Sequence, residues 1–110
     1  YGFFATGQVS IRVNELAEIS RVMKKLREHP LTSIDNSQTH FTDLLSGSFE
    51  LLPTDALQFN LADGRRVIVR PSGTEPKLKC YLQAVGSSKT QAEELLSSLD
   101  ASMREILAAI

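Results

Sequence analysis

Residues 57–83 decide the fold of this chain, and they read LQFNLADGRRVIVRPSGTEPKLKCYLQ. Apolar and polar residues alternate in two runs, as they do in half-buried strands: Leu57, Phe59 and Leu61, then Leu78, Cys80 and Leu82. Between these runs, Asp63-Gly64 suits a two-residue type I′ hairpin turn, and residues 65–70 form the return strand. Gly86 ends the last strand. The stretch therefore predicts antiparallel strands that share one apolar face.

A strand and a helix are predicted ahead of this stretch. Residues 8–13 alternate as a strand does, and residues 1–7 are expected to be a connector or an edge segment that enters a domain of residues 8–110. Asn14 is expected to cap the helix, and Pro30 to end it near His29. The apolar face of this helix carries Leu16, Ile19, Met23 and Leu26.

The segment that follows the helix is rich in turn residues. Asp35-Asn36-Ser37 is expected to be a loop, and residues 39–45 a strand that Ser46-Gly47-Ser48 breaks. Residues 51–54 are expected to form a loop packed on the core.

The longest amphipathic segment comes last. Residues 88–91 and 90–93 both fit the capping-box pattern at its start. Its apolar face carries Ala92, Leu95, Leu96, Leu99, Met103, Ile106, Leu107 and Ile110. Because each helix has one apolar stripe, both helices are predicted to cover the same face of the sheet, which gives an α+β fold.

Composition limits the classes of function. The 110 residues suit one domain, and 42% hydrophobic with 23% charged residues is ordinary for a globular protein. The net charge is −1 and the pI about 6.1, so the basic surplus of a nucleic-acid binder is missing. Together with an expected lack of exposed aromatic residues on the strands, this argues against nucleic-acid binding. No apolar run approaches the roughly 18–20 residues of a membrane span.

The remaining sequence signals concern cysteine, metal and targeting. One cysteine, Cys80, fits a reducing, cytoplasmic location and excludes an internal disulfide. His29 and His40 are far apart, and no Cys/His cluster has the spacing of a metal site. There is no secretory signal, and a start at Tyr1 without methionine indicates the interior of a longer protein, or a processed or cloned fragment.

The loop of residues 70–79, RPSGTEPKLK, is the candidate site. Arg70 ends a strand and offers a planar fork of donors that matches two oxygens of a phosphate. Ser72 and Thr74 add hydroxyl donors, and Gly73 lets backbone N–H groups approach an anion. Lys79 lies in the next strand and points away from the face that Cys80 buries, as Arg70 points away from the face of Val69. Two cations are therefore predicted to flank one site.

A simpler interpretation is a solvated Ser-Gly turn with cations at its rim. Glu75 favours this simpler interpretation, because a carboxylate repels phosphate unless it points away or pairs with Lys77. The other candidates are expected to have structural roles. Cys80 is expected to be a small core residue, and His40 a surface or capping residue.

Residues 70–81, RPSGTEPKLKCY, closely resemble the C-terminal-domain signature of the α-D-phosphohexomutases, the phosphoglucomutase and phosphomannomutase superfamily. The hairpin at residues 63–64, the final helix and the opening Tyr1-Gly2-Phe3-Phe4 also lie where that family has them. The resemblance implies the fourth of four domains, with the order β-α-β(4)-α and a fold like that of the TATA-binding protein.

The resemblance also implies a function. Such enzymes interconvert hexose 1-phosphates and hexose 6-phosphates through a bisphosphate intermediate, using a phosphoserine and a magnesium ion held by other domains. The fourth domain binds the phosphate that is not transferred, through residues that correspond to Arg70, Ser72, Gly73, Thr74 and Lys79. The expected partners are hexose phosphates, hexose bisphosphates and the other domains of the chain, with no nucleic acid, no membrane and no cofactor in this domain. The isolated domain is expected to be inactive.

An alternative from another class stays open. It is a non-enzymatic interaction module that uses the open sheet face to bind protein or nucleic acid, with the loop serving only as a turn.

Overall fold

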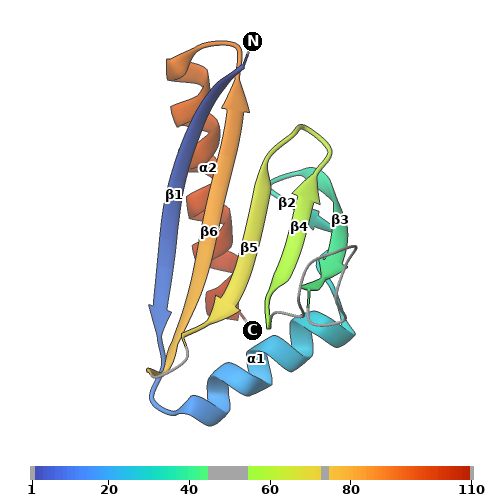
Figure 1. Ribbon diagram of the computed structural model, residues 1–110, viewed down its shortest axis with the longest axis vertical. Coiled ribbons are helices and arrows are strands. Elements are labelled where there is room, and N and C mark those ends of the chain that lie inside the picture. The colour runs from blue at the N-terminus through green and yellow to red at the C-terminus, as the bar shows by residue number, and fades with distance from the viewer. Residues whose placement is uncertain (1, 45–54, 73–74, 110) are drawn as a thin grey trace.

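The sheet contains six antiparallel strands in the spatial order β1-β6-β5-β4-β3-β2, and two helices pack on it (Figure 1). This computed structural model describes residues 2–44, 55–72 and 75–109. Its elements are β1 (Phe3–Arg12), α1 (Leu16–Glu28), β2 (Ser33–Ile34), β3 (Ser37–Asp43), β4 (Leu57–Leu61), β5 (Arg66–Pro71), β6 (Lys77–Gly86) and α2 (Lys89–Ala109). The predicted α+β class is confirmed. The order is β-α-β(5)-α, because the two-residue strand β2 precedes the four predicted strands.

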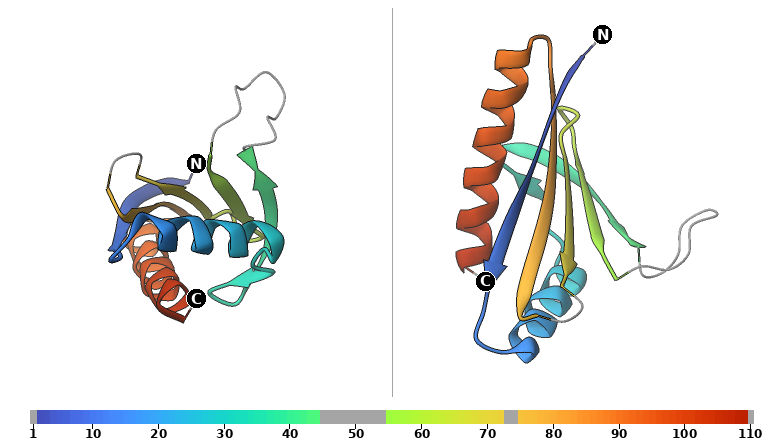
Figure 2. Two further views of the ribbon diagram at one scale, coloured as in Figure 1. Left: turned by 90° about the horizontal axis from the view of Figure 1, so that it is seen from below. Right: turned by 60° about the vertical axis from the view of Figure 1, so that its left-hand side comes forward.

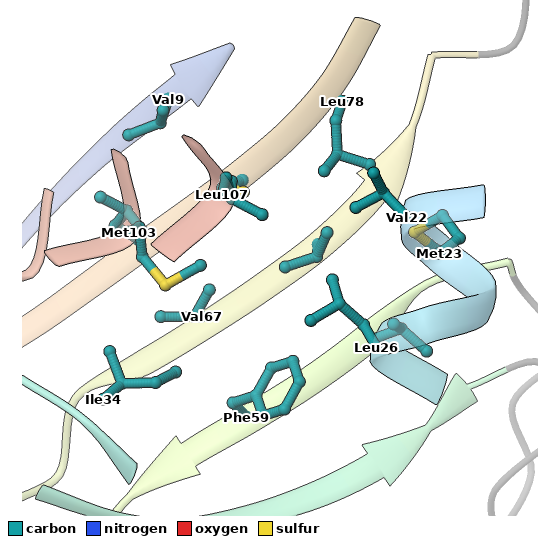
Figure 3. Packing of buried hydrophobic residues seen from close by; sticks show 14 of the residues in the cluster. Val9, Val22, Met23, Leu26, Ile34, Phe59, Val67, Leu78, Met103 and Leu107 are labelled. Atoms are coloured by element: carbon teal, nitrogen blue, oxygen red, sulfur yellow. The ribbon is translucent and has the colours of Figure 1, made fainter. Parts of the chain in front are cut away.

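One hydrophobic core fills the space between the sheet and both helices. Its most deeply buried side chains come from alternate strand residues and from one stripe of each helix, among them Leu26, Leu57, Phe59, Val67, Leu99 and Met103 (Figure 3). Helix α2 runs along β1 and β6, whereas α1 crosses the end of the sheet near the β5–β6 connection (Figure 2). The two helices therefore cover the same face, as predicted, and no helix among the described residues covers the opposite face of the sheet.

Three N-terminal predictions are wrong. Strand β1 begins at Phe3 and not at residue 8, so residues 3–7, expected to be a connector or an edge segment, form an edge segment that pairs with the last five residues of β6. Helix α1 begins at Leu16, so Glu15 and not Asn14 is the N-cap residue, and no side chain there makes a capping bond. Leu16, placed on the buried face by the sequence analysis, is 55% exposed in the first turn of α1. The domain boundary at residue 8 stays a prediction.

The two hairpin turns differ from each other. Asp35 and Asn36 have φ angles of 49° and 61°, so the β2–β3 hairpin closes through a two-residue turn of the I′ kind, where a loop was expected. At the predicted type I′ turn, only Gly64 is left-handed, with φ 98°, and Asp63 is not. The N–H of Gly64 donates to the Leu61 carbonyl at 3.0 Å, which gives a three-residue loop with a glycine bulge.

Arg65 ties these turns to α2. Its side chain is 3% exposed and forms ion pairs with Asp35 and Asp63. The Asp35 carboxylate also accepts hydrogen bonds from Ser98 at 2.6 Å and Ser102 at 3.1 Å, both on α2. The network therefore joins the β2–β3 turn, the β4–β5 turn and α2 at one end of the sheet.

The predicted ends of β6 and α1 are confirmed, and α2 starts next to a predicted cap residue. Ser88 Oγ accepts a hydrogen bond from the N–H of Gln91 at 3.1 Å, so half of the first candidate capping box is formed at the start of α2. Oε1 of Gln91 accepts from the N–H of Ser87 in place of the reciprocal bond from Ser88. Strand β6 ends at Gly86, and α1 ends at Glu28, before Pro30. The expected break at residues 46–48 and the loop at residues 51–54 lie outside the described residues. In the described part of the chain, neither helix is long and apolar enough to span a membrane.

Candidate anion-binding site

Arg70 and Lys79 form a direct cross-strand pair. Arg70 lies on β5 and Lys79 on β6, and the antiparallel register places them opposite each other. Directly opposed residues have Cβ atoms about 4.5–5.5 Å apart and point to the same side of the sheet. Their neighbours Val69 and Cys80 are fully buried, so Arg70 and Lys79 face away from the core. The predicted placement of two cations on one face, from neighbouring strands, is confirmed.

Among the described residues, no carboxylate forms an ion pair with Arg70 or Lys79. Ser10 of β1 is the partner of Lys79 on its other side, so a hydroxyl and two cations lie in one row across β1, β6 and β5. An anion above this row would meet two positive charges and a donor that the strands hold in place.

The predicted loop begins at the end of this row. The N–H of Ser72 donates to the Lys77 carbonyl at 2.9 Å, which extends the β5–β6 ladder one step beyond Pro71. Ser72 is half-buried and lies two residues from Arg70. Gly73 and Thr74, the other predicted ligands, lie outside the described residues.

Glu75 is held by two basic side chains. Its Oε2 atom lies 3.0 Å from Nη2 of Arg12 and 3.5 Å from Nζ of Lys77. The positive charge of Lys77, with hydrogen bonds from Lys77 and Arg12, lowers the pKa of the Glu75 carboxyl. The pairing with Lys77 that the sequence analysis required is therefore present. Arg12 was missed, because 63 residues separate it from Glu75 and no local pattern joins them.

The open face continues into a hollow of about 450 Å³ beside the Arg70–Lys79 row. Its lining includes Thr6, Gln8, Arg66, Ile68, Tyr81 and Gln83, from β1, β5 and β6. Tyr81 is 37% exposed, and Phe3 and Phe4 on β1 are 50% and 68% exposed. The expectation that the strands carry no exposed aromatic residues is therefore wrong. Strand β1 starts earlier than its alternation indicates and so includes Phe3 and Phe4, and Tyr81 lies on the outward side of β6.

The other candidates have structural roles or lie apart. Cys80 is buried, and burial raises the pKa of its thiol to about 12, as befits a core residue. His40 is exposed on β3, and His29 is the C-cap residue of α1, where its N–H donates to the Lys25 carbonyl at 2.8 Å. Within the described residues, no three His, Cys, Asp or Glu side chains cluster to hold a metal ion.

Comparison with known proteins identifies the family of this chain. Residues 9–101 match the family described as phosphoglucomutase/phosphomannomutase, C-terminal domain. The chain is 41% identical over 108 residues to a probable phosphomannomutase of Haemophilus influenzae, with 97% of the chain and 22% of that protein covered. It is 30% identical over 91 residues to a phosphoglucosamine mutase of Thermobifida fusca, with 83% and 20% covered. The chain thus spans about a fifth of the length of these relatives. It belongs to the phosphoglucomutase/phosphomannomutase family and corresponds to the C-terminal domain of its members.

Proposed function

We propose that this domain binds the phosphate that is not being transferred in a phosphosugar mutase that interconverts hexose 1-phosphates and hexose 6-phosphates. The proposed ligands are Arg70, Ser72, Gly73, Thr74 and Lys79. The observation that carries the proposal is the cross-strand pair of Arg70 and Lys79, which faces away from the core at the base of the loop. Family membership supports it, since both relatives are named as mutases of phosphorylated sugars.

A division of labour between domains follows from this role. A phosphate held far from the reacting centre provides binding energy that can orient the reacting end. A site that recognises only phosphate accepts the bisphosphate intermediate in either orientation. The transferred phosphoryl group, the phosphoserine and the magnesium ion would belong to other domains of a cytoplasmic enzyme, so the 110-residue chain alone should be inactive.

Binding can be tested directly on the 110-residue chain. We expect that millimolar inorganic phosphate or glucose 1-phosphate shifts the backbone amide NMR signals of Arg70, Ser72 and Lys79. Arg70→Ala should abolish these shifts. Arg66→Ala is the matched control, because Arg66 is an exposed cation on the same strand and face, about 13 Å away along β5. Absence of shifts at millimolar ligand would remove the proposed site.

Catalysis can be tested in the full-length enzyme that contains this domain. Arg70→Ala removes a charged hydrogen bond to phosphate, worth roughly 1.5–3 kcal/mol, so kcat/KM should fall about ten- to a hundredfold. Unchanged kinetics would exclude Arg70 from the substrate site.

A non-enzymatic interaction module remains the second candidate function, and the exposed rings of Phe3, Phe4 and Tyr81 favour it. Single-stranded nucleic acids stack on such rings. An affinity for RNA or DNA that falls steeply with salt would support this function, and the absence of such binding would exclude its nucleic-acid form.

A further inference from the structure

The C-terminal limb of the phosphate-binding loop, residues 75–77, is fastened to the corner between β1 and α1. Arg12 Nη2 lies 3.0 Å from Glu75 Oε2, and the N–H of Val13 donates to the Pro76 carbonyl at 2.8 Å. On the other limb, the N–H of Ser72 donates to the Lys77 carbonyl. The chain positions on both sides of Gly73 and Thr74 are therefore set by contacts outside those two residues.

The position of the Glu75 carboxylate matters for an anion. Arg12 and Lys77 are cross-strand partners on β1 and β6, one row along from Lys79 and Arg70. Same-face rows are about 7 Å apart. A carboxylate that pairs with the first row stays clear of the second, whereas a carboxylate that swings to the second row would compete with phosphate for its cations.

We propose that Arg12 is a positioning residue for phosphate binding, which acts by drawing the Glu75 carboxylate to the β1 side and away from Arg70 and Lys79. This inference rests on the proposed function. Lys77 also pairs with this carboxylate, at 3.5 Å against 3.0 Å for Arg12, and its charge is the first cause of the lowered Glu75 pKa. Lys77 shares strand β6 with Lys79, whereas Arg12 lies on β1, so Arg12 is the partner that draws the carboxylate to the β1 side. Arg12 therefore affects affinity through Glu75 and not by touching the phosphate.

A mutant cycle on the 110-residue chain tests this role. Inorganic phosphate is the probe, and its Kd is measured by NMR titration for the unmodified chain, Arg12→Ala, Glu75→Gln and the double variant. Arg12→Ala should raise Kd about two- to fivefold, the range that an exposed ion pair supports. The double variant should bind as well as Glu75→Gln alone, because no carboxylate is left to restrain. Arg12→Lys should recover part of the affinity, and Arg66→Ala should leave Kd unchanged.

The outcomes separate this inference from the proposed function. If Arg12→Ala weakens binding equally with and without Glu75, Arg12 contacts phosphate directly and the positioning role is wrong. If the unmodified chain binds phosphate at Arg70 and Lys79 but Arg12→Ala matches Arg66→Ala, the inference fails and the proposed function stands. If the unmodified chain binds no phosphate, both fail. Thermal unfolding of each variant, expected within about 2 °C of the unmodified chain, excludes a general loss of folding as the cause.

Discussion

Replacing Arg65 with methionine should destabilise the domain by about 1.5–4 kcal/mol at pH 7. Arg65 is 3% exposed, and its guanidinium donates to the carboxylates of Asp35 and Asp63 and to the Leu95 carbonyl at 3.3 Å. Methionine keeps the unbranched apolar stem but removes every donor. The variant therefore isolates the contribution of the guanidinium from that of side-chain packing.

The magnitude comes from the two carboxylates, which differ in exposure. Asp35 is 18% exposed, so losing its charged hydrogen bond should cost about 1.5–3 kcal/mol, moderated by its remaining bonds from Ser98 and Ser102. Asp63 is 39% exposed, so solvent screens its ion pair and the loss is at most about 1 kcal/mol. The sum gives the stated range.

Lowering the pH should weaken the same network. Hydrogen bonds from Arg65 and then Ser98 lower the pKa of Asp35. Burial raises the pKa of Asp63, but the hydrogen bonds from Arg65 outweigh it, and the net direction is down. Groups with a depressed folded-state pKa stabilise the fold above their unfolded value of about 3.9, and this stability is lost as the pH falls through the folded-state pKa. The unmodified chain should thus lose more stability than Arg65→Met below about pH 4.

Urea unfolding followed by far-UV circular dichroism measures both effects, at pH 7 and in steps down to pH 3. Arg66→Met is the matched control, because Arg66 is exposed and its described side-chain bond is a single one, to Asn60 at 3.1 Å. It should cost at most about 0.5 kcal/mol. A loss for Arg65→Met below 1 kcal/mol, or equal acid profiles for the variant and the unmodified chain, would refute the reasoning.

Three further predictions concern single residues. Cys80, whose thiol pKa burial raises to about 12, should react with a disulfide reagent at pH 8 only after unfolding, and rapid labelling of the native chain would contradict its burial. Gly86→Ala places a Cβ 2.6 Å from the backbone nitrogen of Ala92, so the start of α2 must shift, and thermal unfolding should show a loss of about 1–3 kcal/mol. Ser88→Ala removes the cap of α2 and should cost about 1 kcal/mol by urea unfolding, whereas an unchanged midpoint would show that the bond from Gln91 contributes nothing.

The sequence predicted correctly those helices and strands whose apolar residues repeat regularly along the chain. Strand β6 and helix α2 were placed correctly because their apolar residues repeat with the period of the structure they form. Residues 3–7 carry no such alternation, and they join β1 because β6 is long enough to supply partners for them. The turn at Asp63-Gly64 has the composition of type I′ but a different geometry, since the hydrogen bond from Arg65 to Asp63 favours another loop.

In the candidate site, too, some features follow from local sequence and others only from the fold. The common orientation of Arg70 and Lys79 follows from strand alternation, so the sequence was enough to predict it. Of the ion-pair partners of Glu75 and Arg65, those close in sequence could be predicted and the distant ones could not. Lys77 is two residues from Glu75, whereas Arg12 and Asp35 reach their partners only through the folded sheet. An arginine next to a hairpin turn also gives no sign in sequence that it is buried.

The strand register that forms the core also positions the two cations of the candidate anion site. A slip of β5 by one residue would turn Arg70 to the core face and the fully buried Val69 outward, and the same slip of β6 would exchange Lys79 and the fully buried Cys80. The apolar residues therefore hold the two cations outward without any contact between the cations and the core. The Arg65 network lies at the β4–β5 turn, at the other end of β5 from the loop (Figure 1). Substitutions there should lower stability while the folded molecules keep their affinity for phosphate, because the strands between the two ends fix the register independently.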